Sequence, residues 1–527
     1  MHRMRDEVHY GDRVMRCYAE RPAHVDALLR AAVRARPDAE ALTEGETRIT
    51  YAELDAAVGR IAGNLAAIGI GKGDRVALIL GNRSEFVSAT FAVARLGAIS
   101  VPLNIRQRQP ENDYVLRHSG AKAVIHEADL AAEIPDVASL PELAHRFAVG
   151  GSAAGSRPFA DLQRPVAAPA PVDIAEEDTF SILYTSGTTG RPKGAMLTHL
   201  GTMHSCLHFV LGWGLGPEDV SILAVPASHV TGLVAVILPM VLAQGRTVIM
   251  PAFKARTYLE LAAAERVTYT IIVPAMYNLC LLDPEFDRFD LSRWRVGAYG
   301  GAPMPEATIK TLAQKLPRMV LCNAYGATET TSPTTMMPLG QGIAHSDSVG
   351  KVVACGEVRI MDDEGREVAP GEPGEIWTAG PMVIPGYWNN PEANAANFVG
   401  GFWKSGDIGS KDADGYLKVF DRKKDMINRA GFKVYSAEVE NVLSHHPEIV
   451  ECAVIGRPDP VLGEKTHAFI VPKSGAVSEA DIRAFCRTRM ADYKIPDRIT
   501  FLADALPRNA NGKIQKPALR EMIAAEA

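Results

Sequence analysis

The sequence predicts an α/β protein with a large N-terminal domain of doubly wound sheets plus a β-rich subdomain, followed by a small α+β C-terminal domain. Apolar segments of strand length alternate with helical patterns over residues 49–330, an order typical of parallel sheets with crossover helices. Beyond Val349, short β-like runs and turns replace this alternation, and a second change follows the charge run at 421–425. Because 527 residues exceed what one hydrophobic core usually holds, two or more domains are expected.

The alternation occurs twice, which predicts two doubly wound units. The first unit is expected to contain helices at 51–68 and 84–96 and strands at 76–80, 99–103 and 123–125. The second is expected to contain strands at 222–225, 247–250, 270–273, 295–298 and 319–321 and helices at 233–243, 258–265 and 276–282. The C-terminal domain is expected to contain helices at 437–444 and 479–490 and strands at 452–455, 468–471 and 499–502.

Two segments fall outside this pattern. Residues 1–7 mix arginines with acids and have no apolar run, so they predict a peripheral tail and not a secretory signal or transit peptide. Residues 151–171 are rich in Gly, Ala, Ser and Pro and predict an exposed connector.

Composition excludes several classes of partner. The 56 basic and 62 acidic residues give a net charge of −6, and no basic run is dense enough for a nucleic-acid surface. Seven cysteines without close pairs favour a reducing, cytoplasmic location over a disulfide framework or a cysteine zinc site. Residues 220–245 lack charges, but prolines, glycines and polar residues interrupt them, so no integral membrane segment is expected.

A loop rich in glycine and hydroxyl groups follows the strand expected at 180–183. It reads Thr185-Ser186-Gly187-Thr188-Thr189-Gly190-Arg191-Pro192-Lys193-Gly194. Glycines let successive N–H groups converge, the hydroxyls add donors and Lys193 adds a positive charge, so the loop predicts a phosphate cradle. A Walker A loop is excluded, because Pro192 stands where that motif needs its second glycine. Pro192 also favours a flap over a helix start. The alternative is a polar surface turn.

Two further loops follow expected strands of the second unit. The strand at 295–298 leads into Tyr299-Gly300-Gly301-Ala302-Pro303. The strand at 319–321 leads into Asn323-Ala324-Tyr325-Gly326-Ala327-Thr328-Glu329. Open α/β sheets bind ligands at the carboxyl ends of their strands, so both loops are candidate parts of one binding site.

Together with Ser405-Gly406-Asp407, the charge run 421–425 and the segment 506–513, these motifs resemble the adenylate-forming enzymes. That superfamily includes acyl-CoA synthetases, peptide-synthetase adenylation domains and beetle luciferases. The match keeps the family's order and spans almost the whole chain. The resemblance implies that a carboxylic acid attacks the α-phosphate of ATP to give acyl-AMP and pyrophosphate, and that a thiol then displaces AMP. ATP, Mg²⁺ and CoA are therefore the expected cofactors and co-substrates.

The resemblance also implies roles for individual residues. The phosphates would be held by Thr185, Ser186, Gly187, Thr188, Thr189, Gly190 and Lys193. The adenine would be held by Gly301, Ala302, Pro303, Asn323, Ala324, Tyr325, Gly326 and Thr328, and the ribose by Asp407 and Arg422. Thr185 and Glu329 would position Mg²⁺ and act in catalysis. Each residue alone has an ordinary alternative, such as packing for Tyr325 or a solvated surface charge for Glu329.

The C-terminal residues are expected to act in turn. Lys513 would stabilise the charge that develops during adenylation, although a lysine after Asn-Gly is otherwise a turn residue. Gly431 would approach the pantetheine arm of CoA. The resemblance places a hinge at Lys424, so the domains are expected at 1–423 and 424–527, the second being mobile. A solvated linker is the alternative interpretation of the charge run. Ala430, Ser436 and Ser405 depart from the family's usual glycine, proline and threonine.

One segment of this chain resembles the family's acid-binding segment: Val225-Pro226-Ala227-Ser228-His229-Val230-Thr231-Gly232. In it, His229 would gate the carboxylate. A hydrogen-bonded core histidine is the alternative. Residues 220–245 contain no Asp for an α-ammonium, and residues 273–280 contain no Arg for a second carboxylate. An apolar pocket of Val230, Val234, Met276 and Tyr299 is expected.

These features predict an acid–CoA ligase for a monocarboxylic acid, either a medium-chain fatty acid or one with a small aromatic or other ring. Three alternatives are open: an enzyme that loads an acyl carrier protein, a luciferase-like oxygenase, and a nucleotide-binding module without catalysis. The sequence leaves the oligomeric state open between monomer and homodimer.

Overall fold

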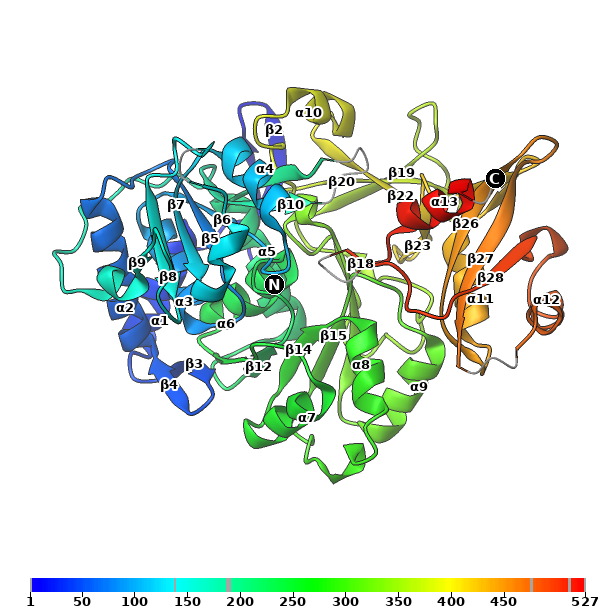
Figure 1. Cartoon of the computed structure of the whole chain (residues 1–527), viewed down its shortest axis with the longest axis horizontal. Helices are drawn as coiled ribbons and strands as arrows, with labels where there is room; N and C mark the ends of the chain where they lie inside the picture. Colours follow the sequence, from blue (N-terminus) through cyan, green and yellow to red (C-terminus); the bar gives the residue numbers. More distant parts are fainter. Residues whose placement is uncertain (1, 137–138, 186–190, 474–476, 510–512, 526–527) are drawn as a thin grey trace. The chain divides into compact units, whose positions relative to one another are not determined.

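A computed structural model of the chain describes residues 2–136, 139–185, 191–473, 477–509 and 513–525 (Figure 1). It contains two compact units. The larger consists of Met1–Met304, Thr308–Val358 and Thr378–Trp403, and the smaller of Pro305–Ala307, Arg359–Trp377 and Lys404–Ala527. The predicted class, α/β with a large and a small part, is confirmed. The predicted pivot Lys424 lies inside the smaller unit, and the boundary at 424 stays a prediction.

The first sheet of the larger unit is the first predicted doubly wound unit. Its seven strands, in spatial order, are β11 (Lys193–Thr198), β10 (Thr179–Thr185), β6 (Ile99–Pro102), β5 (Arg75–Ile79), β7 (Ala121–Glu127), β8 (His145–Val149) and β9 (Arg157–Pro158). All neighbours are parallel except β11, which returns antiparallel to β10 at the edge. The phosphate loop connects these two edge strands.

The second sheet has nine strands. In spatial order they are β18 (Lys351–Val352), β17 (Thr335–Met336), β16 (Val320–Tyr325), β15 (Val296–Tyr299), β14 (Tyr269–Ile272), β12 (Val220–Leu223), β13 (Arg246–Ile249), β3 (Glu40–Glu44) and β4 (Thr47–Thr50). The strands from β16 to β3 are parallel, and the outer strands on both sides are antiparallel. This arrangement brings the carboxyl ends of β15 and β16 together.

Helices connect the strands and separate the two sheets. They are α1 (Val25–Ala35), α2 (Tyr51–Ala67), α3 (Ser84–Arg95), α4 (Gln109–Ser119), α5 (His199–Trp213), α6 (Leu238–Leu242), α7 (Ala255–Ala264), α8 (Pro274–Leu281), α9 (Glu306–Lys315) and α10 (Pro391–Asn397). Helices α3 and α5 contact the first sheet, α2 and α6 contact the second, and α1 touches α2, α3, α5 and α6. A layer of helices therefore lies between the sheets, which explains why α3 and α5 are buried on almost every side.

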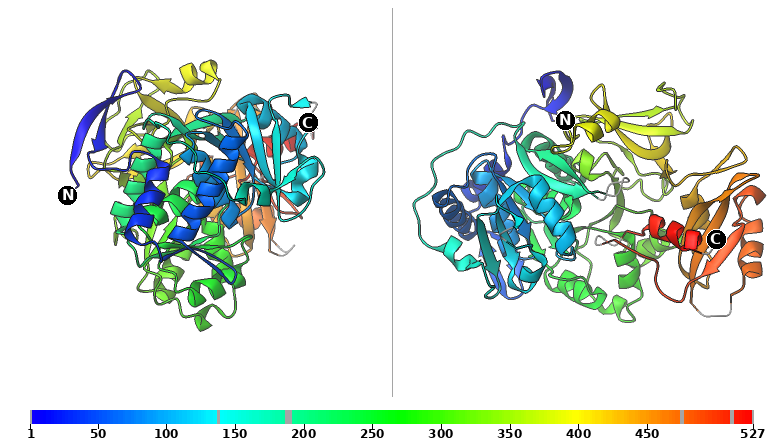
Figure 2. Two further views of the ribbon diagram at one scale, coloured as in Figure 1. Left: turned by 90° about the vertical axis from the view of Figure 1, so that its left-hand side faces the viewer. Right: turned by 45° about the horizontal axis from the view of Figure 1, so that its top comes forward.

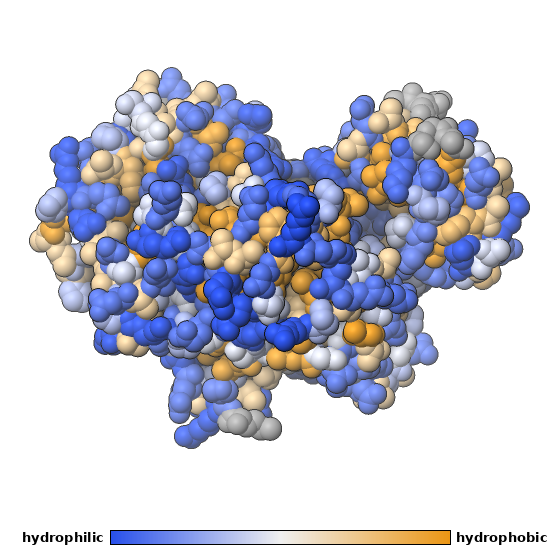
Figure 3. Space-filling model, turned by 90° about the horizontal axis from the view of Figure 1, so that it is seen from below, coloured by the Kyte–Doolittle hydropathy of each residue, from blue (hydrophilic) through white to orange (hydrophobic). Residues whose placement is uncertain are grey.

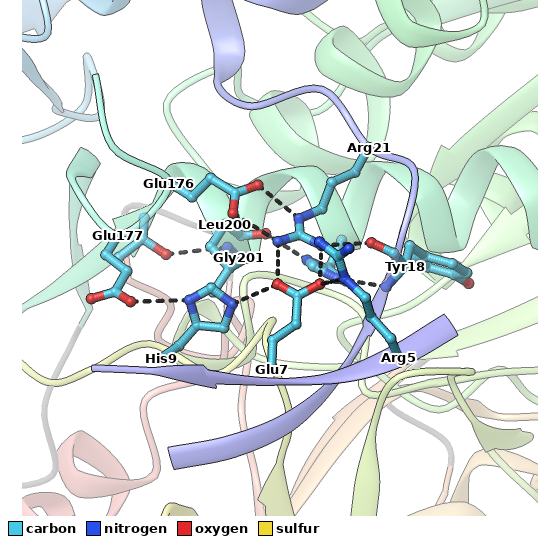
Figure 4. A network of polar contacts seen from close by, with 11 residues as sticks. Arg5, Glu7, His9, Tyr18, Arg21, Glu176, Glu177, Leu200 and Gly201 are labelled. Carbon is cyan, nitrogen blue, oxygen red and sulfur yellow. Dashed lines mark hydrogen bonds and ion pairs between the residues drawn. The ribbon is translucent and has the colours of Figure 1, made fainter. Parts of the chain in front are cut away.

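The N-terminal segment is not a peripheral tail, so that prediction is wrong. Strands β1 (Met4–His9) and β2 (Arg13–Tyr18) form an antiparallel hairpin. Figure 4 shows how it is held: the guanidinium of Arg21 bonds both Glu7, at 2.9 and 2.7 Å, and Glu176, at 2.7 Å. His9 lies between Glu7 and Glu177, at 3.1 and 3.0 Å. Charged partners distant in sequence anchor this segment, so a search for apolar periodicity misses it.

Glu7, His9 and Cys17 bring ligand-type atoms within 4.8 Å of one another, which is the spacing of a metal site. Arg21 already occupies both oxygens of Glu7. Its hydrogen bonds hold the pKa of Glu7 well below the usual value, while burial raises the pKa of the Cys17 thiol to about 12. The cluster is therefore an ion-pair network and not a cation site.

The connector predicted at 151–171 contains strand β9 and a short 3₁₀ helix at Phe159–Gln163. The chain beyond Gln163 is largely exposed up to residue 173, and Figure 2 shows it as a long excursion at the edge of the larger unit. It is not wholly detached: a Cβ at Gly63 of α2 would lie 2.7 Å from the carbonyl oxygen of Ala167. The prediction of an exposed connector is confirmed for the part after the 3₁₀ helix.

A sheet of short strands follows the second doubly wound unit, as predicted. Its strands are β19 (Glu357–Met361), β20 (Gly374–Ala379), β22 (Phe402–Lys411), β21 (Phe398–Val399) and β23 (Leu417–Arg422), the last beside β22. The C-terminal α+β part has a second five-stranded sheet. It consists of β25 (Phe432–Val434), β24 (Ile427–Arg429), β27 (Gly463–Pro472), β26 (Ile449–Asp459) and β28 (Arg498–Phe501), with helices α11 (Ser436–Ser444), α12 (Glu479–Arg487) and α13 (Lys516–Ala525). Of these three helices, α13 is the one that the sequence analysis did not predict.

Among the described residues, no helix is long and apolar enough to cross a membrane. On the face shown in Figure 3, hydrophobic residues are interspersed among hydrophilic ones. The apolar run at 220–245, which lacks charges, is instead divided among β12, a loop, a π-helix and α6.

The hairpin network gives a prediction for stability. Glu7→Gln leaves the buried Arg21 with one carboxylate fewer, and we expect the free energy of unfolding to fall by about 2 kcal/mol. Because the folded pKa of Glu7 is depressed, its contribution is fully present above the unfolded pKa and is lost as pH falls through the folded pKa. The difference between wild type and variant should therefore shrink below about pH 4.5.

Thermal unfolding followed from pH 3 to pH 8 measures this difference. The exposed Glu46 of the β3–β4 turn provides the control substitution Glu46→Gln, which should leave the transition unchanged. An equal transition for Glu7→Gln and wild type at pH 7 would contradict the anchoring role of the network.

Candidate active site

The strands before and after the predicted phosphate loop form a β-hairpin, so the loop does not lead into a helix, as predicted. Strands β10 and β11 pair antiparallel, with Thr185 opposite Lys193, so the loop leaves from the last pair of the ladder. Ser186, Gly187, Thr188, Thr189 and Gly190 lie outside the described residues. Gly194 is required by packing, because a Cβ there would lie 2.8 Å from the Ile182 side chain and 3.4 Å from Trp388.

Glu329, a predicted metal ligand, lies next to a residue that the sequence analysis did not select. The hydroxyl of Tyr387 donates a hydrogen bond of 3.0 Å to Glu329 Oε1. The ammonium of Lys193 lies 4.8 Å from the centre of the same tyrosine ring. The structure therefore joins the strand after the phosphate loop to the predicted metal ligand through one side chain.

The two strand-end loops meet, as predicted. In the parallel register of β15 and β16, Tyr299 is opposite Asn323. Gly300 approaches Ala324 so closely that a Cβ would lie 2.4 Å from the Ala324 carbonyl oxygen. Gly301 has a φ of +77°, and a Cβ there would meet nothing within 4 Å. Only glycine reaches this conformation without strain, and Gly301, Ala302 and Pro303 form an exposed shelf directly after the close approach of Gly300 to Ala324.

The acid-binding segment contains a feature that periodicity did not predict. Thr231–Ile237 is a π-helix that continues into α6, where an ordinary helix was expected. Gly232 fits because a Cβ would lie 2.2 Å from the carbonyl oxygen of Pro226. The hydroxyl of Tyr269 donates to the Ala235 carbonyl at 2.7 Å, which satisfies one of the π-helix acceptors. Single-turn irregularities of this kind occur frequently at functional sites.

His229 precedes the π-helix and is half-buried. The N–H of Thr231 donates to its Nδ1 at 3.2 Å, so the ring proton of the neutral imidazole is on Nε2. The predicted pocket residues Val230, Val234, Met276 and Tyr299 are all buried, with exposures of 8% or less. Burial also raises the pKa of Tyr299 to about 12, so its hydroxyl is neutral. None of these four buried side chains is charged.

Asn82 is a second residue that the sequence analysis missed. It is 6% exposed, and its Nδ2 donates to the carbonyls of Leu223, Val225 and Met250 at 3.0–3.1 Å. Its Oδ1 accepts from the N–H of Ala227 at 2.8 Å. One amide side chain thus fixes the acid-binding segment to the ends of β12 and β13. A lone asparagine before a helix carries no signal of this role, because all of its partners are backbone groups.

The smaller unit holds the predicted ribose pair. Asp407 and Arg422 are opposite each other on β22 and β23, and their side chains form an ion pair of 2.7 Å. The Asp407 side chain is 8% exposed and that of Arg422 47%. The structure therefore brings these two predicted residues together.

The charge run at 421–425 is anchored at intervals. The buried Asp421 accepts from the N–H and hydroxyl of Ser436, at 2.5 and 2.7 Å, and Asp425 pairs with Arg520 at 2.8 Å. Lys423 pairs with Asp363 at 2.8 Å and with Glu375 at 3.2 Å, whereas Lys424 is exposed. The charge run is thus not a wholly solvated linker, because Asp421, Lys423 and Asp425 have partners and Lys424 is exposed between them.

The remaining predicted residues of the smaller unit are exposed. Ala430 and Gly431 have φ values of +52° and +88°. Ala430 therefore adopts a left-handed conformation, which the glycine expected at this position from the family resemblance would adopt more easily. Lys513 donates its N–H to Asn509 Oδ1 at 3.0 Å, and residues 510–512 lie outside the described part. How any of these residues act on a ligand stays a prediction.

The donor chemistry of the larger unit fits a nucleotide with a hard cation. Glu329 and Thr185 carry oxygen atoms of the kind that Mg²⁺ prefers, and Lys193 carries an ammonium group that would suit a phosphate. Within the described part of the chain, no basic side chain forms an ion pair with Glu329. A doubly wound fold with such groups at its strand ends belongs to the class of nucleotide-binding α/β enzymes.

Comparisons with known proteins identify the family. Residues 29–388 match the AMP-binding enzyme family, and residues 438–513 match the AMP-binding enzyme C-terminal domain. The chain therefore belongs to the AMP-binding enzymes. The predicted resemblance to the adenylate-forming superfamily is confirmed.

Relatives with assigned activities support the acyl-CoA synthetase branch of this family. The chain is 37% identical over 491 residues to feruloyl-CoA synthase of Amycolatopsis sp, covering 92% of this chain and 96% of the relative. It is 38% identical over 502 residues to the long-chain-fatty-acid–CoA ligase FadD13 of Mycobacterium tuberculosis, covering 94% and 98%. The anthranilate CoA ligase AuaEII, solved with anthranoyl-AMP, has a TM-score of 0.89 at 29% identity, covering 96% and 99%. The prediction of an AMP-forming acid–thiol ligase of the acyl-CoA synthetase type is confirmed.

Gly300 gives a direct test of the strand-end site. Gly300→Ala forces a methyl group against the Ala324 carbonyl and should displace the shelf that follows it. Because such overpacking costs about 1–3 kcal/mol, we expect ATP affinity to fall about tenfold or more. Calorimetric titration with ATP measures this loss.

The matched control is Gly216→Ala, since a Cβ at Gly216 would meet nothing within 4 Å. Its ATP affinity should equal that of wild type. Unchanged affinity in Gly300→Ala, with a normal thermal transition, would place the nucleotide elsewhere.

Proposed function

We propose that the chain is an ATP-dependent acid–CoA ligase that activates a monocarboxylic acid as its acyl-adenylate and transfers the acyl group to free CoA. The observation that carries the proposal is that Lys193, on the strand after the phosphate loop, and Glu329, on the loop after β16, contact the same side chain, Tyr387. The family relationship supplies the reaction class, and the residues of this chain supply the roles proposed below.

The first half-reaction joins two anions. A carboxylate oxygen bonds to the α-phosphorus of ATP, and the bond from that phosphorus to the β-phosphate oxygen breaks, releasing pyrophosphate. Such a step needs cations and oriented N–H groups around the transferring phosphorus. We assign Lys193 and the loop 185–190 to the β- and γ-phosphates and Lys513 to the charge that develops at the α-phosphate.

Thr185 and Glu329 are the proposed ligands of Mg²⁺, which when bound would neutralise charge on the phosphates. A similar solved structure, the o-succinylbenzoate CoA synthetase of Bacillus subtilis (TM-score 0.83, 30% identity), is described in complex with ATP and a magnesium ion. The described partner of the half-buried Glu329 side chain is the hydroxyl of Tyr387, an uncharged donor.

The nucleoside would lie between the shelf of Gly301, Ala302 and Pro303 and the ring of Tyr325, with Asn323 at the base edge. We assign the ribose hydroxyls to Asp407, a carboxylate that only accepts hydrogen bonds. Its ion pair with Arg422 orients the carboxylate, since one of its oxygens is held at 2.7 Å.

In the second half-reaction the thiol of CoA attacks the acyl carbon, and AMP leaves with the bridging oxygen. We propose that residues 424–527 form a mobile domain that pivots at Lys424 between the two steps. Gly431 would then face the pantetheine arm, and the absence of a side chain leaves room for it. The anchored neighbours of Lys424 support a pivot confined to one or two residues.

The acid is proposed to be a monocarboxylate with an aromatic ring or a medium-length chain. The buried apolar set of Val230, Val234, Met276 and Tyr299 offers no charge to a second carboxylate or an ammonium. A feruloyl-CoA synthase and an anthranilate CoA ligase among the similar proteins support an aromatic acid, and FadD13 supports a fatty acid. His229 would donate from Nε2 to the carboxylate at the pocket's entrance.

A carrier protein is the second candidate acceptor. A relative from Streptomyces coeruleorubidus, 34% identical over 91% of this chain, is named a fatty acid–[acyl-carrier-protein] ligase. Parallel reactions with free CoA and with a phosphopantetheinyl carrier protein distinguish the two acceptors.

A screen of pyrophosphate release tests the proposed substrate class. Medium-chain and aromatic monocarboxylic acids should release pyrophosphate with Mg²⁺, ATP and CoA, whereas amino acids and dicarboxylic acids should not. A dicarboxylate as the best substrate would overturn the assignment of an apolar pocket. Formation of thioester with carrier protein but not with CoA would favour the second candidate.

Lys513 provides a prediction that separates the half-reactions. In Lys513→Ala, acyl-AMP formation should fall by about 10²–10³-fold, because the cation at the α-phosphate is lost. Conversion of supplied acyl-AMP and CoA to thioester should remain at the wild-type rate. Both rates are measured by chromatographic detection of AMP and thioester.

Lys516 offers the control for a nearby positive charge, since its ammonium is held by Glu440 at 2.8 Å and by the Ser436 hydroxyl at 2.6 Å. Lys516→Met should affect the two half-reactions equally if it affects them at all. Equal loss of both half-reactions in Lys513→Ala would contradict the role given to Lys513.

A further inference from the structure

The segment 384–388 passes between the phosphate hairpin and the turn that carries Glu329. The N–H of Ile384 donates to the Glu329 carbonyl at 2.9 Å. On the other side, the N–H of Trp388 donates to the Gly194 carbonyl at 2.7 Å, and the N–H of Met196 donates to the Gly386 carbonyl at 3.2 Å. The segment is therefore bonded through its backbone to both parts of the candidate phosphate site.

Tyr387 is the central residue of this segment and is only 2% exposed. Asn394 of α10 accepts from its N–H at 2.6 Å and donates to its carbonyl at 3.2 Å. Its ring meets that of Phe398 edge-on, at a centroid distance of 5.7 Å. The side chain thus has a fixed position, supported by groups that have no part in the proposed chemistry.

From that position Tyr387 contacts two charged groups in different ways. Its hydroxyl donates to Glu329 Oε1 at 3.0 Å, and its ring face receives the Lys193 ammonium at 4.8 Å. The hydrogen bond comes from a phenol hydroxyl, which is an uncharged group, so Tyr387 meets the Glu329 carboxylate as a neutral donor. A neutral donor orients a carboxylate without cancelling its charge, and a ring face orients an ammonium while leaving its N–H donors free for phosphate.

Within the described residues, no ion pair joins Lys193 to Glu329, although both contact the side chain of Tyr387. If the two side chains paired directly, each would lose much of the charge that a metal-bound nucleotide needs.

We propose that Tyr387 is a positioning residue for adenylation: it orients Glu329 toward the metal, seats Lys193 for the phosphates and keeps the two charges apart. This inference rests on the proposed nucleotide site. It concerns Tyr387 alone, which acts through its two neighbours and does not touch the reacting atoms. Hydrogen bonds to metal-ligating carboxylates typically affect metal affinity by about 10–100-fold.

The two contacts can be separated by experiment, because Tyr387→Phe removes only the hydroxyl and Tyr387→Leu removes the ring as well. Calorimetry measures ATP affinity with EDTA and with excess Mg²⁺, in the full-length protein and without any acid. The ratio of the two affinities reports the Glu329 contact, and the metal-free affinity reports the Lys193 contact.

In Tyr387→Phe we expect the gain in affinity from Mg²⁺ to fall about tenfold or more, with metal-free affinity unchanged. In Tyr387→Leu the metal-free affinity should fall as well. Tyr258→Phe is the control, because this buried tyrosine loses its hydroxyl on a helix, α7, that carries none of the proposed ligands. It should match wild type in both conditions.

A double variant distinguishes loss of the Glu329 contact from a general packing defect caused by Tyr387→Phe. In a Glu329→Gln background, Tyr387→Phe should not reduce the gain from Mg²⁺ any further, whereas a general packing defect would reduce it again. An unchanged gain in Tyr387→Phe, beside normal ATP binding by wild type, would overturn the inference alone. Failure of the wild-type protein to bind ATP would contradict the proposed function and this inference with it.

Discussion

Opposite charges on neighbouring segments of a protein tend to pair, and a paired Lys193 and Glu329 would offer less charge to a nucleotide. In this structure one buried ring lies against both, bonding Glu329 through its hydroxyl and Lys193 through its face. The backbone supports this arrangement, because the segment around Tyr387 is bonded to the phosphate hairpin and to the Glu329 turn. The proposed adenylation chemistry depends on these unneutralised charges, since its two reactants are both anions.

The rest of the larger unit fixes where those charges lie. Two mainly parallel sheets with a layer of helices between them bring the ends of β15 and β16 into register, so Gly300, which precedes the glycine shelf, meets Ala324, which precedes Tyr325. The antiparallel return of β11 at the sheet edge gives the phosphate loop a hairpin base in place of a helix. Asn82 then ties the predicted acid-binding segment to the ends of β12 and β13 in the second sheet. The site is thus assembled from loops held by rigid strands.

Much of this arrangement could be predicted from the sequence, because hydrophobic periodicity reports the buried strands and helices directly. The strands β5, β12 and β15 and the helix α2 were predicted within one or two residues of their observed ends. The close approach of the two strand-end loops, at Gly300 and Ala324, followed from the rule that ligands bind at the carboxyl ends of parallel strands.

Other features left no local signal. The N-terminal hairpin is held by Arg21 and by Glu176, which is more than 150 residues away, so its charged sequence looked like a tail. The π-helix at Thr231–Ile237 has the same apolar composition as an α-helix. Tyr387 carries no motif of its own, because its role comes from partners on β11 and at Glu329, which only the fold brings together.

The central claim is that a carboxylate oxygen of the acid attacks the α-phosphorus of ATP. A reaction with a carboxylic acid labelled with ¹⁸O in both oxygens, followed by mass spectrometry of the products, tests this claim directly. After transfer to CoA, the account predicts one ¹⁸O atom in AMP and none in pyrophosphate. Label in pyrophosphate or orthophosphate, or AMP without label, would contradict it.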